Sequence, residues 1–151
     1  MNINKTKDFK AHLHTHVYHE GVAQKGANNV VSLIMKTLKQ SGLLRAGDPD
    51  GELVIVFDNC IGQNKNNTVL KMVTFLCEMF YFKKVQFLFL VVGYTKNAAD
   101  RLFNMLQRFY RLQILFTMRQ LFKALAASDS VIIHPDTAEY FFDWDNFLSL
   151  F

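Results

Sequence analysis

The sequence predicts an α/β fold in which parallel strands alternate with helices along the chain. Two continuously apolar stretches, ELVIVF (52–57) and VQFLFLVV (85–92), are typical of central parallel strands that are covered on both faces. Apolar residues at helical spacing run from Val69 to Phe80, between the two strands, and a second helix is predicted to follow an N-cap at Asn97. Strand, helix, strand and helix in this order indicate a parallel sheet with crossover connections.

The N-terminal part is predicted to hold one strand and one helix. The segment HLHTHVYHE alternates as a strand does, with His12, His14 and His16 on one face. Apolar residues then recur at helical spacing over residues 30–38, and this helix is expected to end at Ser41-Gly42.

The C-terminal part is predicted to contain shorter elements. ILFT (114–117) is interpreted as a short strand, TMRQLFKALAAS (117–128) as a helix and SVIIHP (130–135) as another strand. Because 151 residues suffice for one hydrophobic core, residues 1–151 are expected to form a single domain.

Composition excludes several classes of protein. Half of the residues are hydrophobic, yet the chain has no run of about 18 uncharged apolar residues, so no transmembrane helix and no membrane partner are expected. The polar start MNINKTKDFK lacks the apolar core of a secretory signal, and Cys60 and Cys77 form no disulfide framework or metal pair. These features favour a nuclear or cytoplasmic protein with free thiols over a secreted one.

The charge is unevenly distributed. The segment 59–125 holds ten basic residues against two acidic ones, whereas residues 126–151 hold five acidic residues and no basic ones. An excess of positive charge in the middle of the chain suits a polyanion such as nucleic acid. The alternative is a set of solvated cations on helix faces.

Two acidic residues are placed where a catalytic site is expected. Asp58 closes the first buried strand, and Asp100 lies in GYTKNAAD, which closes the second strand and opens its helix. If the strands are neighbours, the carboxyl ends of the sheet bring both carboxylates together, and they would hold Mg²⁺ or Mn²⁺. Lys65, Lys96 and Arg101 lie close in sequence and are candidates to contact the phosphates of a nucleic acid.

Each of these residues also has a purely structural interpretation. Asp58 can accept backbone hydrogen bonds in the turn after its strand, and Asp100 can stabilise the positive end of its helix dipole. The amides of NCIGQNKNN can shape a loop and cap the next helix, with Asn66 or Asn67 as N-cap. Cys60 is interpreted as a packed small residue rather than a nucleophile.

The alternating histidines leave a similar choice. A strand face with His12, His14 and His16 can ligate zinc, but the sequence offers no second group of ligands at a fixed offset. An ordinary exposed strand face is therefore the favoured interpretation.

The stretches FDNCIGQNKNN and GYTKNAADRLF resemble the transposase-like domains of the ribonuclease H-like superfamily, which carry DNC-x-GQNKNN and GHTK-x-x-x-D-R-x-F motifs. YHEGVAQKGANNVVSLI and FFDWDNFLSLF resemble the flanking stretches, so the resemblance covers the chain from about Tyr18 onward. It implies a ribonuclease H-like fold and a two-metal core that cuts and joins DNA strands. Asp58 would then be the second acid and Asp100 the third.

The same resemblance assigns a loop-shaping role to Asn59, Gln63 and Asn64. Two departures from the family pattern stand out: Tyr94 occupies the histidine position of GHTK, and Asp8 is the sole acid before Tyr18.

A catalytic triad of this kind needs a first acid on an earlier strand, so the chain is expected to be a partial domain without the first strands of the fold and to be inactive alone. The alternative function is a domesticated, non-catalytic module that binds nucleic acid or protein. An unpaired edge on the strand that ends at Asp58 also predicts self-association.

Overall fold

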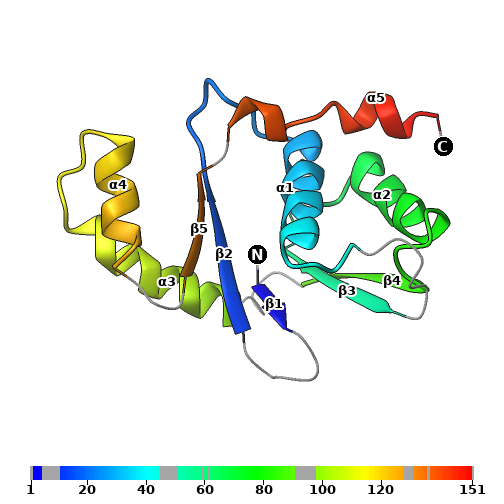
Figure 1. Cartoon of the computed structure of the whole chain (residues 1–151), viewed down its shortest axis with the longest axis horizontal. Coiled ribbons are helices and arrows are strands. Elements are labelled where there is room, and N and C mark those ends of the chain that lie inside the picture. The colour runs from blue at the N-terminus through cyan, green and yellow to red at the C-terminus, as the bar shows by residue number, and fades with distance from the viewer. Residues whose placement is uncertain are drawn as a thin grey trace. The chain divides into compact units, whose positions relative to one another are not determined.

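The computed structural model describes residues 2–4, 11–44, 51–58, 60, 62–90, 98–127, 131–135 and 137–150, and shows a mixed α/β protein with two small sheets (Figure 1). The chain divides into two compact units. One comprises Met1–Tyr18 and Thr95–Asp136, and is called the β2–β5 unit after its parallel strands. The other comprises His19–Tyr94 and Thr137–Phe151, and is called the β3–β4 unit. The single domain expected from the sequence stays a prediction.

The β3–β4 unit contains a two-stranded parallel sheet with helices around it. Its elements are α1 (Ala27–Gln40), β3 (Glu52–Phe57), α2 (Asn67–Glu78), β4 (Lys84–Phe89), the 3-10 turn η1 (Ala138–Tyr140) and α5 (Trp144–Leu148). The strands are in register from Glu52 opposite Lys84 to Phe57 opposite Phe89. Helix α2 connects them and contacts β4, α1 packs on α2, and α5 packs on both. The predicted order of strand, helix and strand is therefore confirmed, and the last two positions of the predicted second strand, 91–92, lie outside the described residues.

The core of this unit comes from α1, α2, α5 and one face of β3. The side chains with no exposed surface are Val31, Thr37, Leu38, Val69, Met72, Leu76 and Leu148. From β3, Ile55 and Phe57 are buried, whereas Val54 and Val56, on the opposite face, are 50% and 51% exposed. The prediction of strands covered on both faces is thus wrong for β3, because successive side chains point to opposite faces and the helices described here cover one of them. None of the six residues of β4 is fully buried either.

Both long helices of this unit end in a Schellman motif, in which the residue after the C-cap adopts a left-handed conformation. In α1 that residue is Gly42, with φ 66°, and Leu43 N donates to Leu38 O at 2.9 Å. The predicted end of the helix at Ser41-Gly42 is confirmed. In α2 the equivalent residue is Phe80, with φ 56°, a conformation that a residue with a Cβ adopts at some cost.

The β2–β5 unit contains a three-stranded sheet and two helices. Its elements are β1 (Asn2–Asn4), β2 (Ala11–Val17), α3 (Ala98–Arg111), α4 (Met118–Leu125) and β5 (Val131–Pro135). The strand order is β1-β2-β5, with β1 antiparallel and β5 parallel to β2. Strands at β2 and β5 and helices at α3 and α4 are confirmed, β1 was not predicted, and Asn97 lies outside the described residues. His14 is 7% exposed, so an ordinary exposed face is the wrong interpretation for this histidine.

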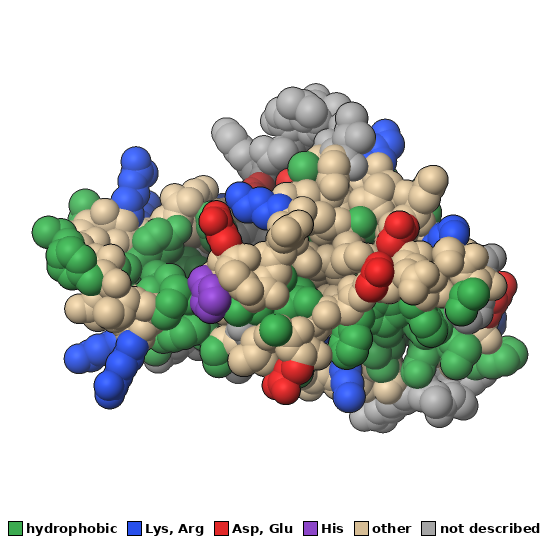
Figure 2. Space-filling view, turned by 90° about the horizontal axis from the view of Figure 1, so that it is seen from above, with side chains coloured by type: hydrophobic (Ala, Val, Ile, Leu, Met, Phe, Trp, Pro, Cys, Tyr) green, Lys and Arg blue, Asp and Glu red, His purple; other side chains and the backbone are tan. Residues whose placement is uncertain are grey.

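The segment ILFT is not a strand. Residues 114–116 have no regular structure, and Thr117 is the N-cap of α4. Its side chain accepts the Gln120 N–H at 3.2 Å while Gln120 Oε1 accepts the Thr117 N–H at 3.0 Å, which is a complete capping box. Ile114 and Phe116 are 81% and 83% exposed, and Figure 2 shows apolar side chains beside cationic ones on the surface formed by α3 and α4, at the left of the view.

Two features of the described residues bear on partners. Strand β3 pairs with β4 alone, so the other edge of β3 has no strand partner within the part of the chain that the structure describes. In that same part, every helix is too short or too polar to cross a lipid bilayer.

Candidate functional site

Strand β3 delivers Asp58 to the carboxyl end of the β3–β4 sheet. The side chain of Asp58 is exposed, directly after the last residue of the strand, and Asn64 Nδ2 donates a hydrogen bond to its Oδ1. The sheet continues to this point, because Leu90 N donates to Phe57 O at 2.9 Å. Polar groups at this edge of a parallel sheet are held by rigid strands, which suits a binding site.

The loop behind Asp58 is a tight turn around one carbonyl group. Cys60 O accepts the backbone N–H groups of Asn64 at 2.9 Å and Lys65 at 3.2 Å. Asn66 then caps α2: its Oδ1 accepts the Val69 N–H at 3.0 Å, and its Nδ2 donates to Gln63 O at 2.9 Å. Of the two N-cap candidates, Asn66 is therefore confirmed.

The three residues with a predicted loop-shaping role differ in their contacts. Asn64 holds the Asp58 carboxylate, and Gln63 contributes its backbone carbonyl to the cap of α2. Asn59 lies outside the described residues. Cys60 is a half-buried free thiol, as is Cys77, which confirms the expectation of unpaired cysteines.

Lys65 lies at the same edge of the sheet as Asp58. Its Nζ is 5.9 Å from the centre of the Phe89 ring, at the end of β4, which is the outer limit of a cation–π contact. Its side chain is exposed. The structure thus brings a carboxylate (Asp58), an amide (Asn64) and an ammonium group (Lys65) to the carboxyl ends of two neighbouring parallel strands.

The remaining predicted site residues belong to the other unit or lie outside the described residues. Asp100 is in the first turn of α3, with a half-buried side chain and a buried Oδ2 atom. Arg101 follows it and is exposed. Lys96 lies outside the described residues. Because Asp58 is in the β3–β4 unit and Asp100 in the β2–β5 unit, their expected shared site stays a prediction.

The donor atoms fit the expected metal in kind. The carboxylates of Asp58 and Asp100 are hard oxygen groups of the kind that Mg²⁺ and Mn²⁺ prefer as ligands. Among the described side chains there is no group of three or more His, Cys, Asp or Glu residues already arranged around one point.

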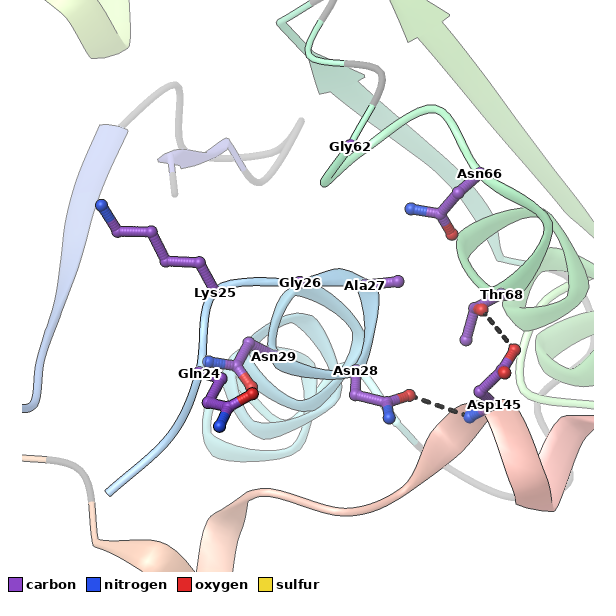
Figure 3. A pocket seen from close by; sticks show the side chains of 10 residues that line it. All are labelled: Gln24, Lys25, Gly26, Ala27, Asn28, Asn29, Gly62, Asn66, Thr68 and Asp145. Atoms are coloured by element: carbon purple, nitrogen blue, oxygen red, sulfur yellow. Dashed lines mark hydrogen bonds between the residues drawn. The ribbon is translucent and has the colours of Figure 1, made fainter. Parts of the chain in front are cut away.

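An open pocket of about 450 Å³ lies elsewhere in the β3–β4 unit, where the starts of α1 and α2 meet α5 (Figure 3). It is lined by Gln24, Lys25, Gly26, Ala27, Asn28, Asn29, Gly62, Asn66, Thr68 and Asp145. These residues come from three stretches far apart in the sequence. The three are residues 24–29 at the start of α1, residues 62–68 at the start of α2 and Asp145 in α5.

Hydrogen bonds tie the three stretches together. Thr68 Oγ1 donates to Asp145 Oδ1 at 2.8 Å, and Asp145 N donates to Asn28 Oδ1 at 2.8 Å (Figure 3). Asn28 Nδ2 donates in turn to Asp143 Oδ1 at 3.0 Å. The network was not predicted from the sequence, although Asp143 is of a residue type that often serves as an N-cap: its Oδ1 accepts the Asn146 N–H at 3.2 Å.

Further contacts fix the C-terminal segment on α1 and α2. Ser32 Oγ accepts the Trp144 indole N–H at 2.9 Å and the Phe142 backbone N–H at 3.2 Å. Lys71 Nζ donates to Leu148 O at 3.1 Å, and Lys36 Nζ lies 3.6 Å from the centre of the Tyr140 ring. The acidic segment is therefore a packed part of this unit.

No curated protein and no solved structure matches the chain. The family described as a domain of unknown function, DUF7869, matches residues 3–151, which is nearly the whole chain, and the chain belongs to this family.

Proposed function

We propose that this chain is a transposase-derived domain with a ribonuclease H-like fold, whose ancestral chemistry is the divalent-metal-dependent cleavage and transfer of DNA strands. In this proposal Asp58 is the second acid of the catalytic set and Asp100 the third. Mg²⁺ or Mn²⁺ is the cofactor, and DNA is the substrate. Lys65, Lys96 and Arg101 are the candidate contacts to phosphate.

The observation that supports the proposal best is the edge of the β3–β4 sheet. Asp58 is exposed at the end of β3, oriented by Asn64, and Lys65 lies over the end of the parallel neighbour β4. A metal held by the carboxylate would neutralise the charge of a phosphodiester, and the ammonium group of Lys65 would attract the same phosphate. Asp58 directly follows β3, and Lys65 lies in the loop that leads from β3 to α2.

A measurement of Mn²⁺ binding by calorimetry tests this proposal. We expect Asp58→Asn and Asp100→Asn each to weaken binding at least tenfold, because each substitution removes a charged ligand. Glu52→Gln is the matched control, since Glu52 is also acidic and exposed but lies at the amino end of β3. Equal binding by all three variants, or no binding by the parent chain, would overturn the assignment of Asp58 and Asp100.

The alternative, a non-catalytic module that binds nucleic acid, rests on the excess of positive charge in the middle of the chain. Fluorescence anisotropy with a labelled DNA duplex separates the two proposals. DNA binding that persists in EDTA and weakens steeply with salt, in a chain that binds no Mn²⁺, would support the alternative. Binding that requires Mn²⁺ and is lost in Asp58→Asn would support the catalytic ancestry.

A further inference from the structure

Three histidines gather on one face of the β2–β5 ladder. His14 and His16 are two residues apart on β2 and therefore share a face, and His134 on β5 is the direct register partner of His16. The chain thus brings together one pair of histidines from its N-terminal part and a third histidine 120 positions after His14. The sequence pattern alone did not place this third histidine beside the other two.

The rings of His14 and His134 lie end to end rather than face to face. Their planes differ by 3°, and 5.2 Å separates the ring centres while His14 Nδ1 and His134 Nε2 are 2.9 Å apart. If the two rings were stacked face to face with their centres 5.2 Å apart, His14 Nδ1 and His134 Nε2 would be farther apart than 2.9 Å. One nitrogen must therefore donate a proton to the other.

His16 also contacts His134, its register partner on β5. Its ring centre lies 4.8 Å from that of His134, with the planes 18° apart. His14 is 7% exposed, whereas His16 and His134 are half-buried, so the cluster has a buried end and an end that solvent reaches.

We propose that His14, His16 and His134 form a binding site for a divalent transition metal such as Zn²⁺, independent of the Mg²⁺ or Mn²⁺ proposed for Asp58 and Asp100. Two imidazole nitrogens that ligate one tetrahedral zinc ion at 2.0–2.1 Å are about 3.4 Å apart. The His14–His134 pair already approaches that separation, at 2.9 Å. The metal takes the place of the shared proton, which leaves with solvent as the metal binds.

The metal site is not preformed, and the positions of the three rings show which atoms must move for a metal to bind. The two nitrogens have to separate by a few tenths of an ångström and the rings have to tilt until both lone pairs point at one ion. The half-buried ring of His16 then turns about its side-chain bonds to supply a third nitrogen. A pair of alternate residues on one strand and a residue on the next strand is a ligand set that parallel or antiparallel ladders can hold, and water fills the fourth position.

The chemistry of the donors decides which metals bind. Neutral imidazole nitrogens suit Zn²⁺, Co²⁺, Ni²⁺ and Cu²⁺ and bind Mg²⁺ poorly. The histidine cluster is therefore expected to leave Mg²⁺ unbound, and the absorption of nitrogen-ligated Co²⁺ distinguishes it from a carboxylate site, so one proposal can fail while the other stands.

Titration of the full chain with Co²⁺, followed by visible absorption, tests the proposal, with Zn²⁺ added afterwards as a competitor. We expect one equivalent to bind with the absorption of a nitrogen-ligated, four-coordinate ion. His134→Gln should weaken Co²⁺ binding about 100-fold, because it removes a direct ligand and substitutions of residues that only support a ligand already weaken metal binding by about 10–100-fold. His16→Gln should weaken binding and change the spectrum. His19→Gln is the control, because His19 is an exposed histidine whose Nδ1 accepts the Gly21 N–H at 3.2 Å.

The outcomes are distinct. Unchanged binding in His134→Gln or His16→Gln, with folding verified by circular dichroism, would overturn the proposal, as would the absence of saturable binding below millimolar Co²⁺. A loss of binding in His19→Gln as large as in His16→Gln would also overturn it, because the metal would then bind surface histidines without selection. If His134→Gln does not fold, the half-buried position 16 decides the question.

Discussion

Ser32→Ala is the substitution whose effect on stability the structure predicts most directly. Ser32 lies on α1 and is 3% exposed, and its hydroxyl oxygen accepts both the Trp144 indole N–H and the Phe142 backbone N–H. Alanine keeps the helix and removes the acceptor, so two donors of the C-terminal segment lose their partner at once. The substitution therefore probes how firmly that segment is attached to α1.

The size of the effect follows from these two hydrogen bonds. Each net hydrogen bond contributes about 0.5–1.5 kcal/mol to the free energy of unfolding, so their joint loss should lower it by about 1–3 kcal/mol. The upper half of this range is expected, because the donors are only partly able to reach water where they lie against α1. Ser149→Ala is the control: the Ser149 hydroxyl donates to Asn146 O at 2.6 Å but is exposed, and its loss should cost less than about 0.5 kcal/mol.

Urea unfolding monitored by tryptophan fluorescence is a suitable assay, because Trp144 is the only tryptophan of the chain and reports on this contact. Circular dichroism of the same samples shows whether the helices unfold in the same transition. A double-mutant cycle with Trp144→Phe isolates the indole–hydroxyl bond and should give a coupling of about 1 kcal/mol; its four proteins are compared by circular dichroism, because variants with Trp144→Phe have no tryptophan. If Ser32→Ala changes the free energy of unfolding no more than Ser149→Ala does, the C-terminal segment is not held as the structure shows.

Four other substitutions test separate features of the fold. Asn66→Ala removes the N-cap of α2 and should lower the free energy of unfolding by about 1 kcal/mol, measured in urea; an unchanged value would contradict the cap. Gly42→Ala should lower the free energy of unfolding by about 1 kcal/mol through its left-handed backbone alone, since a Cβ there meets no atom within 4 Å, and an unchanged value would contradict the left-handed end of α1. Phe80→Gly relieves the same conformation in α2 and should be stabilising by about 0.5–1 kcal/mol; a loss of stability would mean that the exposed ring contributes packing. Val56→Lys places a charge on the exposed face of β3 and should reduce self-association in sedimentation equilibrium, and a parent chain that is monomeric at all concentrations would contradict that expectation.

The elements that sequence analysis predicted correctly are those with a long and regular pattern. Helices α1 and α2 repeat apolar residues over three or more turns, and β3 and β4 are apolar runs bounded by polar loops, so local pattern and tertiary packing agree. The error at ILFT has the opposite cause. Three apolar residues do not distinguish a strand from a loop, and the capping box of Thr117 and Gln120 determines where the next helix begins.

Other features depend on contacts that no local pattern encodes. The side chains of Val54 and Val56 on the outer face of β3 are apolar, which predicted that this face is covered. Whether a strand is covered on one face or on two depends, however, on how many layers of structure pack on the sheet. The contact between His14 and His134 joins positions 120 residues apart, and only the parallel pairing of β2 with β5 brings them together. Polar β1, with the sequence NIN, has no apolar alternation and becomes a strand by pairing with β2.

The amide-rich motif can now be divided by what each residue does. Asn66 caps α2 and the Cys60 carbonyl closes the turn, so these two residues contribute to folding, as does Thr68 directly after the motif, which donates to Asp145. Asp58 and Lys65 are exposed, and neither supports the core. Stability and metal binding should therefore depend on different residues. Asn66→Ala should unfold more easily and still bind Mn²⁺ when folded. Asp58→Asn should lose Mn²⁺ binding, while its free energy of unfolding stays within about 0.5 kcal/mol of that of the parent chain. Should Asp58→Asn instead destabilise the chain as much as Asn66→Ala, the carboxylate would have a structural role in the loop, and the strongest support for a metal-dependent ancestry would be lost.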